Sequence, residues 1–366
     1  MPEIAIPGRP VNSASFTVAG RQIPIRVCLF WAGLTIWLGN TVIQTGSSGF
    51  AALFASLTFV FEIALITSFT RTISLDRVAS TYCLGGAMAA VMWVVAYAFT
   101  SVEPNVDAVS RQFFVPFMEE LLKVAPVLFI LWRFGESRRS SVGASDVLLL
   151  AAASGGGFGV VEEAYIRQSL HSVQSLAWLP ITRINGETLT AGHGVWTTLA
   201  GATLGLALLW RPRKPLNYLL ASSGLFWSIL DHSHHNYGVD RSGFSVDSFN
   251  FITGHGWFSL YFFILGVIAV IGTDAYAVRA MVSSHPQLKL HGFKPPANRR
   301  EGSPLKVLWA FLLERRAFAY VLFRCQRSQG AMREKLQKLA AVLGRRLMRP
   351  SPVLVSPKKS DAAVAQ

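Results

Sequence analysis

Long apolar runs follow one another through most of the chain, and they limit what it can fold into. Each run is near the roughly 20 residues that a helix needs to cross the hydrocarbon core of a bilayer. Helices satisfy their own backbone hydrogen bonds, which a medium without water requires. The sequence therefore predicts an all-α fold: a polytopic integral membrane helix bundle with about eight transmembrane helices. The expected spans lie at about residues 27–46, 49–70, 80–100, 111–132, 146–166, 189–210, 215–236 and 251–273.

The composition agrees with a membrane protein. Apolar residues make up 51% of the chain, charged residues make up 15%, and the mean hydropathy is +0.39. Soluble domains carry about 25% charged residues. The net charge of +14 does not indicate a nucleic-acid partner, because 18 of the 34 Lys and Arg follow residue 274 and no nucleic-acid-binding motif appears. The cysteines, Cys28, Cys83 and Cys325, are too far apart to suggest a disulfide framework.

Basic residues predict the orientation in the membrane. Lys and Arg are concentrated in the loops after the second, fourth and sixth expected spans and in the tail, and loops of this kind face the cytoplasm. We therefore expect a multi-pass cell-membrane protein with both its N- and C-termini in the cytoplasm. Residues 1–26 would form a cytoplasmic N-terminal segment, 27–273 the eight-span membrane domain, and 274–366 a basic cytoplasmic tail.

The tail contains two helical patterns. Residues 304–324 mix apolar and basic side chains, which is typical of a helix lying in the membrane surface. Residues 331–348 repeat apolar side chains every three or four positions, which predicts an amphipathic helix. The tail is therefore expected to bind anionic lipid and to end in a disordered segment.

Ionisable residues inside the expected spans cost about 2.5–3.5 kcal/mol each on insertion scales, so they point to function. Four spans place such residues at a similar depth near the outer face. Glu62 lies nearer the other face and His255 belongs to no pattern, so we interpret both as structural. Glu119 and Lys123 are four apart and could also be a simple neutralising pair. The clustered residues are Glu119, Glu120, Lys123, Glu162, Glu163, His193, Asp231, His232, His234 and His235.

The last of these spans contains the stretch DHSHHN, which looks like a metal site. Helical spacing divides it into two faces. His232 and Asn236 are four apart and share one face, while Asp231 and His235 share another. The first pair has the residue types that polarise a carbonyl or stabilise an oxyanion. Asp231 is expected to orient His235, and His234 is expected to lie at the rim.

Four motifs in order resemble those of the PrsW family of intramembrane proteases. The sequence EELLK at 119–123 resembles the family's EExxK motif, and GFGVVEEAY at 157–165 resembles its GFxxxEN segment. HGVWTTLAGATLG at 193–205 resembles its third motif, and HSHHN at 232–236 fits the last one, HxxxD or HxxxN. The resemblance covers about residues 111–236, the expected catalytic core. Glu163 stands where the family usually has Asn, and Asn236 where many members have Asp.

The resemblance implies a protease related to the CAAX prenyl proteases, in which a glutamate activates water without a covalent acyl-enzyme. Family members cleave membrane-bound anti-sigma factors. A single-span membrane protein, cut near the outer face in regulated proteolysis, is therefore the expected substrate. The residue chemistry favours the same idea, because three carboxylates in a low-dielectric site are not all ionised at once and one is then suited to act as a general base.

Roles follow for the carboxylates and the first histidine. Glu119 is expected to activate the water, with Glu120 and Lys123 setting its charge and position. Glu162 and His193 would orient the water or carry the proton to the leaving amine.

The remaining residues would act on the oxyanion or from behind the site. His232 and Asn236 are expected to stabilise the tetrahedral oxyanion, and the supporting residues besides Lys123 are Glu163, Asp231 and His235. Glycines 155–157 would let helices or substrate approach closely.

Alternatives remain at this point. We expect no cofactor, but the same fold could hold Zn²⁺ on His193, His232 and Glu162 with water as the fourth ligand. Intramembrane Glu and His are also what a proton-coupled transporter needs, although these residues gather near one face. A non-catalytic scaffold that binds transmembrane segments is a third reading, and the oligomeric state stays open.

Overall fold

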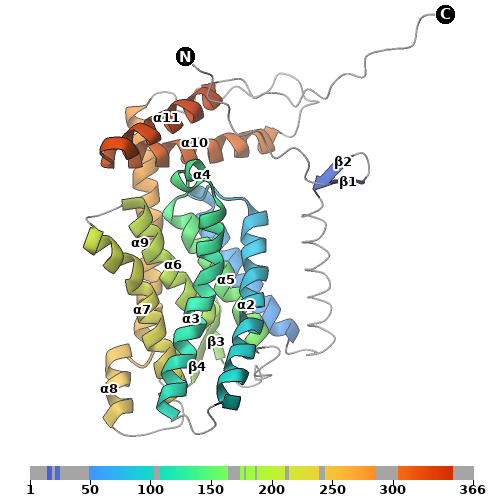
Figure 1. Cartoon of the computed structure of the whole chain (residues 1–366), viewed down its shortest axis with the longest axis vertical. Helices are drawn as coiled ribbons and strands as arrows, with labels where there is room; N and C mark the ends of the chain where they lie inside the picture. The colour runs from blue at the N-terminus through green and yellow to red at the C-terminus, as the bar shows by residue number, and fades with distance from the viewer. Residues whose placement is uncertain are drawn as a thin grey trace, which may run out of the picture.

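The computed structural model describes most of the chain as a bundle of helices with two further helices lying across one end (Figure 1). The helices of the bundle run along the long axis of the molecule. Their outward faces carry large exposed apolar side chains such as Phe54, Phe61, Trp93 and Phe226, which is what a lipid-facing surface requires. The described residues are 15–18, 21–24, 49–102, 108–163, 174–176, 179–185, 188–210, 214–238, 244–285 and 304–348.

Helix α5 (Ala144–Val161) forms the centre of the bundle, and all but two of its side chains are buried. It packs against α2 (Leu75–Val102) and α6 (Gly192–Trp210). Its sequence AAASGGG has almost no side-chain volume, so the neighbouring backbones come close. A methyl group at Gly155 would lie 2.6 Å from the carbonyl oxygen of His193 on α6, and one at Gly157 would overlap the backbone of Tyr82 on α2. The glycines expected to allow close approach therefore serve helix–helix contacts.

Four helical segments in the described part of the chain are long and apolar enough to cross a membrane: Gly49–Phe69, Leu75–Ala98, Ala144–Val161 and Asp247–Ser284, the last of which contains a turn at 254–256. Three more helices, α3 (Ala108–Arg133), α6 and α7 (Lys214–Gly238), pack among them. These three carry the polar residues of the expected core, which lowers their hydropathy. The all-α membrane bundle is therefore observed, while the number of eight spans stays a prediction and the span at 27–46 lies outside the described residues.

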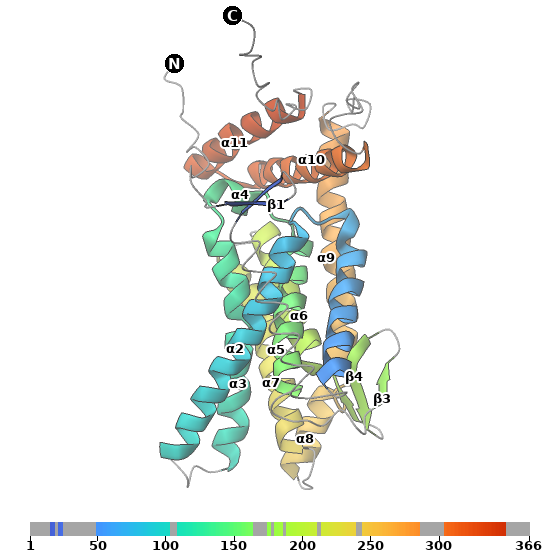
Figure 2. The same ribbon diagram turned by 90° about the vertical axis from the view of Figure 1, so that its right-hand side faces the viewer.

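Two small antiparallel sheets were not expected in an all-α chain. Strands β1 (Ser15–Val18) and β2 (Arg21–Pro24) form a hairpin. Strands β3 (Gln174–Leu176), β4 (Leu179–Asn185) and β5 (Thr188–Thr190) form a three-stranded sheet in the order β3-β4-β5. Figure 2 shows this sheet beside the lower half of the bundle, away from α10. The span expected at 189–210 therefore begins later, at Gly192.

The span expected at 251–273 is also different. Residues up to Thr253 belong to α8 (Phe244–Thr253), and α9 (Trp257–Ser284) starts after a turn and continues eleven residues past 273. All three turn residues, Gly254, His255 and Gly256, have positive φ angles of 56°, 55° and 84°. Two of them are glycines, which adopt this conformation without a steric penalty.

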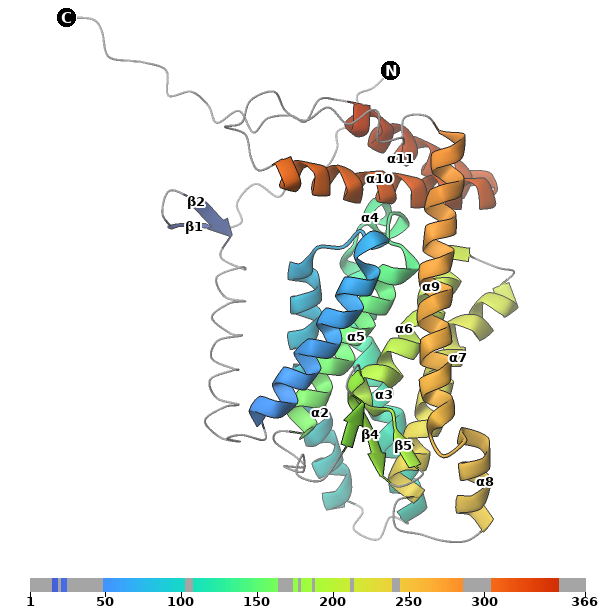
Figure 3. The same cartoon turned by 180° about the vertical axis from the view of Figure 1, so that it is seen from behind.

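Helices α10 (Pro304–Arg327) and α11 (Gly330–Met348) lie at the residues where the tail patterns predicted helices, and α10 crosses the end of the bundle (Figure 3). Its lower face is hydrogen-bonded to the bundle. Arg316 Nη1 donates to the carbonyls of Ser68 and Arg71, and Tyr320 Oη donates to the carbonyl of Thr70. Arg324 donates to the carbonyls of Arg139, in the short helix α4 (Glu136–Ser140), and Val142.

Candidate active site

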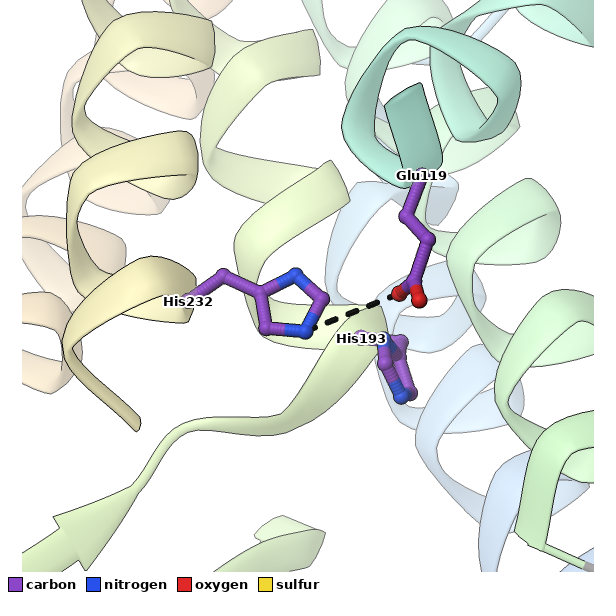
Figure 4. Close-up of side chains that lie close together, drawn as sticks. All are labelled: Glu119, His193 and His232. Carbon is purple, nitrogen blue, oxygen red and sulfur yellow. Dashed lines mark ion pairs between the residues drawn. The ribbon is translucent and has the colours of Figure 1, made fainter. Parts of the chain in front are cut away.

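Four helices bring six ionisable side chains into one buried cluster. Helix α3 supplies Glu119, Glu120 and Lys123, because residues three and four apart lie on one face of a helix. Glu162 is the first residue after α5, His193 is the second residue of α6, and His232 lies on α7. Each of the six is at most 7% exposed. Figure 4 shows Glu119, His193 and His232 converging from three helices.

Lys123 contacts three other members of the cluster. Its Nζ lies 2.6 Å from Glu120 Oε1, 2.6 Å from His193 Nδ1 and 3.6 Å from Glu119 Oε2. The ammonium group also lies 4.7 Å from the centre of the Phe158 ring, which adds a cation–π contact. The pair expected from the i,i+4 spacing thus exists, but the shorter contact is with Glu120.

The contacts of His193 determine its tautomer. An ammonium group can only donate hydrogen bonds, so the Nδ1 atom facing Lys123 is the unprotonated acceptor. Nε2 therefore carries the proton, and it lies 2.7 Å from Glu162 Oε2. Both ring nitrogens of His193 are in use, and the imidazole connects the α3 ammonium group to the carboxylate at the end of α5.

His232 has the opposite tautomer and one nitrogen available. Its Nδ1 lies 2.9 Å from Glu120 Oε1, the oxygen that also accepts from Lys123, so Nδ1–H is the donor. The Nε2 lone pair then faces Glu119 Oε2 at 3.6 Å, as the dashed line in Figure 4 marks. In this tautomer Nε2 accepts hydrogen bonds, which differs from the donor role expected for His232 at an oxyanion.

The ring of His232 is held in place by Trp196 on α6. The two rings stack with centroids 4.4 Å apart and an interplanar angle of 18°. Trp196 Nε1 donates to Asp231 Oδ2 at 2.7 Å, and Ser259 Oγ donates to the same oxygen at 2.6 Å. Trp196 and Ser259 were missed by sequence reasoning, because a tryptophan and a serine in apolar helices look like ordinary core residues.

The other expected residues lie around the cluster. Asp231 has the partners just described, and His235 Nδ1 lies 3.1 Å from Thr190 Oγ1 on β5, so the structure gives both members of the expected Asp231–His235 pair other partners. Asn236 is half-buried one turn beyond His232, and Glu163 is half-buried next to Glu162.

The expected rim residue, His234, is buried instead. Its Nε2 lies 2.7 Å from Asn250 Oδ1 on α8, and its Nδ1 lies 3.2 Å from Thr253 Oγ1. His255, interpreted as structural, accepts a hydrogen bond on its carbonyl from Leu189 of β5. The contacts of His234 thus join α7 to α8, and the Leu189–His255 hydrogen bond joins β5 to the turn between α8 and α9.

The cluster lies in the half of the bundle away from α10. Helix α5 begins at the α10 end, where Asp274 accepts hydrogen bonds from the backbone N–H groups of Ala144 and Ser145 and Arg324 donates to Val142. Glu162 is 18 residues beyond Ala144, which corresponds to about 27 Å along a helix. A site at that depth would be reached from the membrane face opposite α10.

The donor set suits a metal ion only in part. The side chains whose ligand atoms come within 4.8 Å of one another are Glu119, His193 and His232, so Glu119 takes the place expected for Glu162. His232 fits well, since Glu120 orients its ring from the other nitrogen as second-sphere carboxylates do. His193 does not fit as it stands, because its two nitrogens contact Lys123 and Glu162. The arrangement thus presents two ligand atoms for a metal, and a third requires His193 to release one partner.

Comparison with known proteins agrees with the sequence motifs. A family model described as PrsW family intramembrane metalloprotease matches residues 51–273, which is 223 of the 366 residues and includes every member of the cluster. Comparison with curated proteins and with solved structures gives no match. With its buried Glu–Lys–His cluster and its apolar helices, the chain is a membrane-embedded protein that belongs to the PrsW family of intramembrane proteases.

Proposed function

We propose that the protein hydrolyses a peptide bond of a membrane-anchored protein, with Glu119 as the general base that activates water. The observation that carries this proposal is the pair of acceptors formed by Glu119 Oε2 and His232 Nε2, 3.6 Å apart in a buried site. One water molecule can donate a hydrogen to each of them. Its oxygen is then held with a lone pair directed away from both acceptors, toward a substrate carbonyl.

The reaction needs no covalent intermediate with the protein. Glu119 takes a proton as the water oxygen bonds to the carbonyl carbon. The C–N bond of the tetrahedral adduct then breaks while the proton passes from Glu119 to the departing amine nitrogen. Glu120 accepts from both Lys123 and His232, and Lys123 balances the charge of its carboxylate. By balancing the charge of Glu120, Lys123 reduces the electrostatic effect of this second carboxylate on Glu119 as Glu119 gains and loses a proton.

Two further roles belong to this proposal. Asn236 would donate its amide N–H to the oxyanion from one turn beyond His232. Glu162 would hold His193, and through it Lys123, in the position observed. The distribution of basic residues favours a cytoplasmic α10 end, and on this proposal the cut lies near the outer face. A single-span protein, such as a membrane-bound regulator, is the expected class of substrate.

The test is cleavage by purified protein reconstituted in liposomes with candidate single-span substrates. Glu119→Gln keeps the shape of the side chain but removes the base, so we expect cleavage to fall by at least about 1000-fold, near the upper part of what general-base catalysis supplies. Glu62→Gln is the matched control, because Glu62 is a half-buried glutamate in the helix at 49–66, outside the cluster.

Glu62→Gln should cleave at the rate of the wild-type protein. Full activity in Glu119→Gln would exclude Glu119 as the base. Equal binding of substrate by both variants and by the wild-type protein, without cleavage by any of them, would identify a scaffold instead of a protease.

A metal-dependent version of the site is the second candidate. It is favoured by the proximity of Glu119, His193 and His232 and by the description of the matching family as metalloproteases. Glu119 and His232 would hold the ion, joined by His193 once its contact with Lys123 is released. A bound metal would supply Lewis-acid activation of the water or the carbonyl. We expect the metal-free mechanism, so a strong chelator should leave cleavage unchanged. Loss of cleavage with EDTA, restored by Zn²⁺ and accompanied by metal in the purified protein, would favour the metal version.

A further inference from the structure

A second group of charged side chains lies at the α10 end of the bundle, far from the cluster. Arg71 follows the helical segment that ends at Phe69, and Arg315 and Arg316 lie on α10. The guanidinium groups of Arg71 and Arg316 each lie 5.5 Å from the centre of the Trp309 ring. Arg316 is fixed by its hydrogen bonds to the carbonyls of Ser68 and Arg71. Two cations thus share one aromatic ring, and the backbone holds one of them in place.

These cations lack an ion-pair partner within the described residues. None of the three arginines forms an ion pair with a described carboxylate. Arg71 is only 7% exposed, yet its Nε has no hydrogen-bond partner in the described chain, and neither has Nε of Arg315. A buried cation without a partner is costly, so the site calls for an anion.

The carboxylate of Asp146 does not meet this need. Asp146 acts on both Arg71 and Arg316 electrostatically, but its two oxygens already accept from Thr72 N, Thr72 Oγ1, Ile73 N and Gly143 N. Burial lowers the pKa of Arg316. The positive charges of Arg71 and Arg315 lower this pKa further, while Tyr320 and Asp146 raise it. Burial likewise lowers the pKa of Arg71, against the attraction of Asp146. The positive charges are therefore close enough to repel one another.

Apolar side chains next to the arginines indicate what kind of anion fits. Phe69, two residues before Arg71, is 81% exposed, and Ile66 one turn earlier is exposed as well. Trp309 is 39% exposed, and tryptophan is enriched where membrane meets water. A free phosphate ion would leave these apolar surfaces uncovered. A molecule with a phosphate group and acyl chains would cover both parts.

We propose that Arg71, Arg315, Arg316 and Trp309 form a binding site for the headgroup of an anionic phospholipid, whose acyl chains lie along Phe69 and Ile66. The phosphate is attracted by the combined charge of the three guanidinium groups, a kind of side chain that binds phosphate through hydrogen bonds. The lipid thereby joins α10 to the end of the first described helix. This site is independent of peptide hydrolysis.

The experiment measures the melting temperature of the full-length protein in detergent. Dioctanoyl phosphatidylglycerol is the probe, and dioctanoyl phosphatidylcholine and inorganic phosphate are the comparisons. We expect phosphatidylglycerol to raise the melting temperature of the wild-type protein. Arg71→Gln and Arg315→Gln should each need an about fivefold or greater lipid concentration for half of that rise, as expected for the loss of one basic contact. Arg315 is half-buried, so its variant tests the site even if Arg71→Gln folds poorly.

Arg333→Gln is the matched control, since Arg333 is an exposed arginine on α11 and the charge change is the same. It should respond to phosphatidylglycerol as the wild-type protein does. The proposal is overturned if Arg71→Gln and Arg315→Gln respond like Arg333→Gln, or if phosphatidylcholine is as effective as phosphatidylglycerol. An equal rise with inorganic phosphate alone would show a site for a free anion and overturn the lipid assignment.

Discussion

At the scale of single residues, Trp196 determines which way His232 faces. Its indole ring stacks on the imidazole, and its N–H is bonded to Asp231. Asp231 also accepts from Ser259, whose hydroxyl accepts in turn from Trp227 Nε1 at 2.8 Å. A chain of hydrogen bonds thus fixes the plane of the indole, and the indole fixes the plane of the imidazole. Trp196 is a positioning residue, since it acts on the proposed water site through His232.

Trp196→Phe should lower the turnover rate more than substrate affinity. The ring that stacks on His232 is kept, but the carboxylate of Asp231 loses a donor, which costs about 1.5–3 kcal/mol for a hydrogen bond to a charged group. We expect kcat to fall about tenfold or more with little change in KM, as measured on a fluorogenic single-span substrate. Trp227→Phe removes an N–H that is two hydrogen bonds further along the chain of Trp196, Asp231 and Ser259, and it should leave kcat nearly unchanged. Equal losses in both variants would mean that the effect is only structural.

The identity of the clustered residues could be predicted from the sequence, but their pairing could not. Charges are so costly in a bilayer that Glu119, Lys123 and His193 stand out in their apolar runs. Pairing depends on how each helix is rotated about its axis, and apolar packing partners set that rotation. For this reason the spacing offered Glu119 as one possible partner of Lys123, whereas the ammonium group lies closest to Glu120 and His193.

At the scale of elements, the position of the site depends on the close packing of α5 against α6. The backbone of α6 at His193 lies against Gly155, so any side chain there pushes on the residue that holds Lys123. Hydrogen bonds reinforce the contact between α5 and α3, because Ser154 Oγ donates to the carbonyl of Lys123. The small residues of α5 therefore set the distance between the two helices that carry Lys123 and His193.

Gly155→Ala should reduce both stability and cleavage. The added methyl group would lie 2.6 Å from His193 O and from Thr197 Oγ1, and the carbonyl of His193 cannot yield without moving α6. Overpacking of this kind typically costs about 1–3 kcal/mol, so a lower melting temperature and slower cleavage are expected. Gly272→Ala on α9 is the control, because its methyl group would meet nothing within 4 Å. A Gly155→Ala protein as stable and active as Gly272→Ala would contradict the close-packing argument.

Long helices could be predicted because a long apolar run in a membrane satisfies its own backbone hydrogen bonds only as a helix. The β3-β4-β5 sheet was missed, although Asn185 and Gly186 form the dipeptide most typical of a hairpin. The break between α8 and α9 was also missed. Gly254 and Gly256 mark it, but hydropathy averaged over a span does not register two glycines.

At the scale of the whole molecule, α10 is part of the membrane domain's structure. Four consecutive side chains of α10 are buried: Phe318, Ala319, Tyr320 and Val321. Its hydrogen bonds reach segments up to 250 residues earlier in the chain. Helix α11, by comparison, packs on α10 through Leu336 and Gly344. The two tail helices should therefore contribute unequally to stability.

Two truncations test this difference. A chain that ends after His285 loses α10, and each large apolar side chain that is no longer buried costs about 1.5–3 kcal/mol. We expect the melting temperature to fall by about 10 °C or more, at about 2–4 °C per kcal/mol. A chain that ends after Arg327 keeps α10 and should fall much less. Identical melting temperatures for the full-length chain and the chain ending at His285 would show that α10 is detachable.

The order of the cluster along the chain has a consequence for how the protein is made. Glu120 and Lys123 leave the ribosome 112 residues before His232 and 70 residues before His193 respectively. At about 5–20 residues per second, the wait for His232 lasts about 6–22 s. Until His193 and then His232 are synthesised, the two carboxylates and the ammonium group of α3 lack their partners on α6 and α7. The charges of α3 are therefore enclosed only after α6 and α7 have been made, so the site is completed late in synthesis.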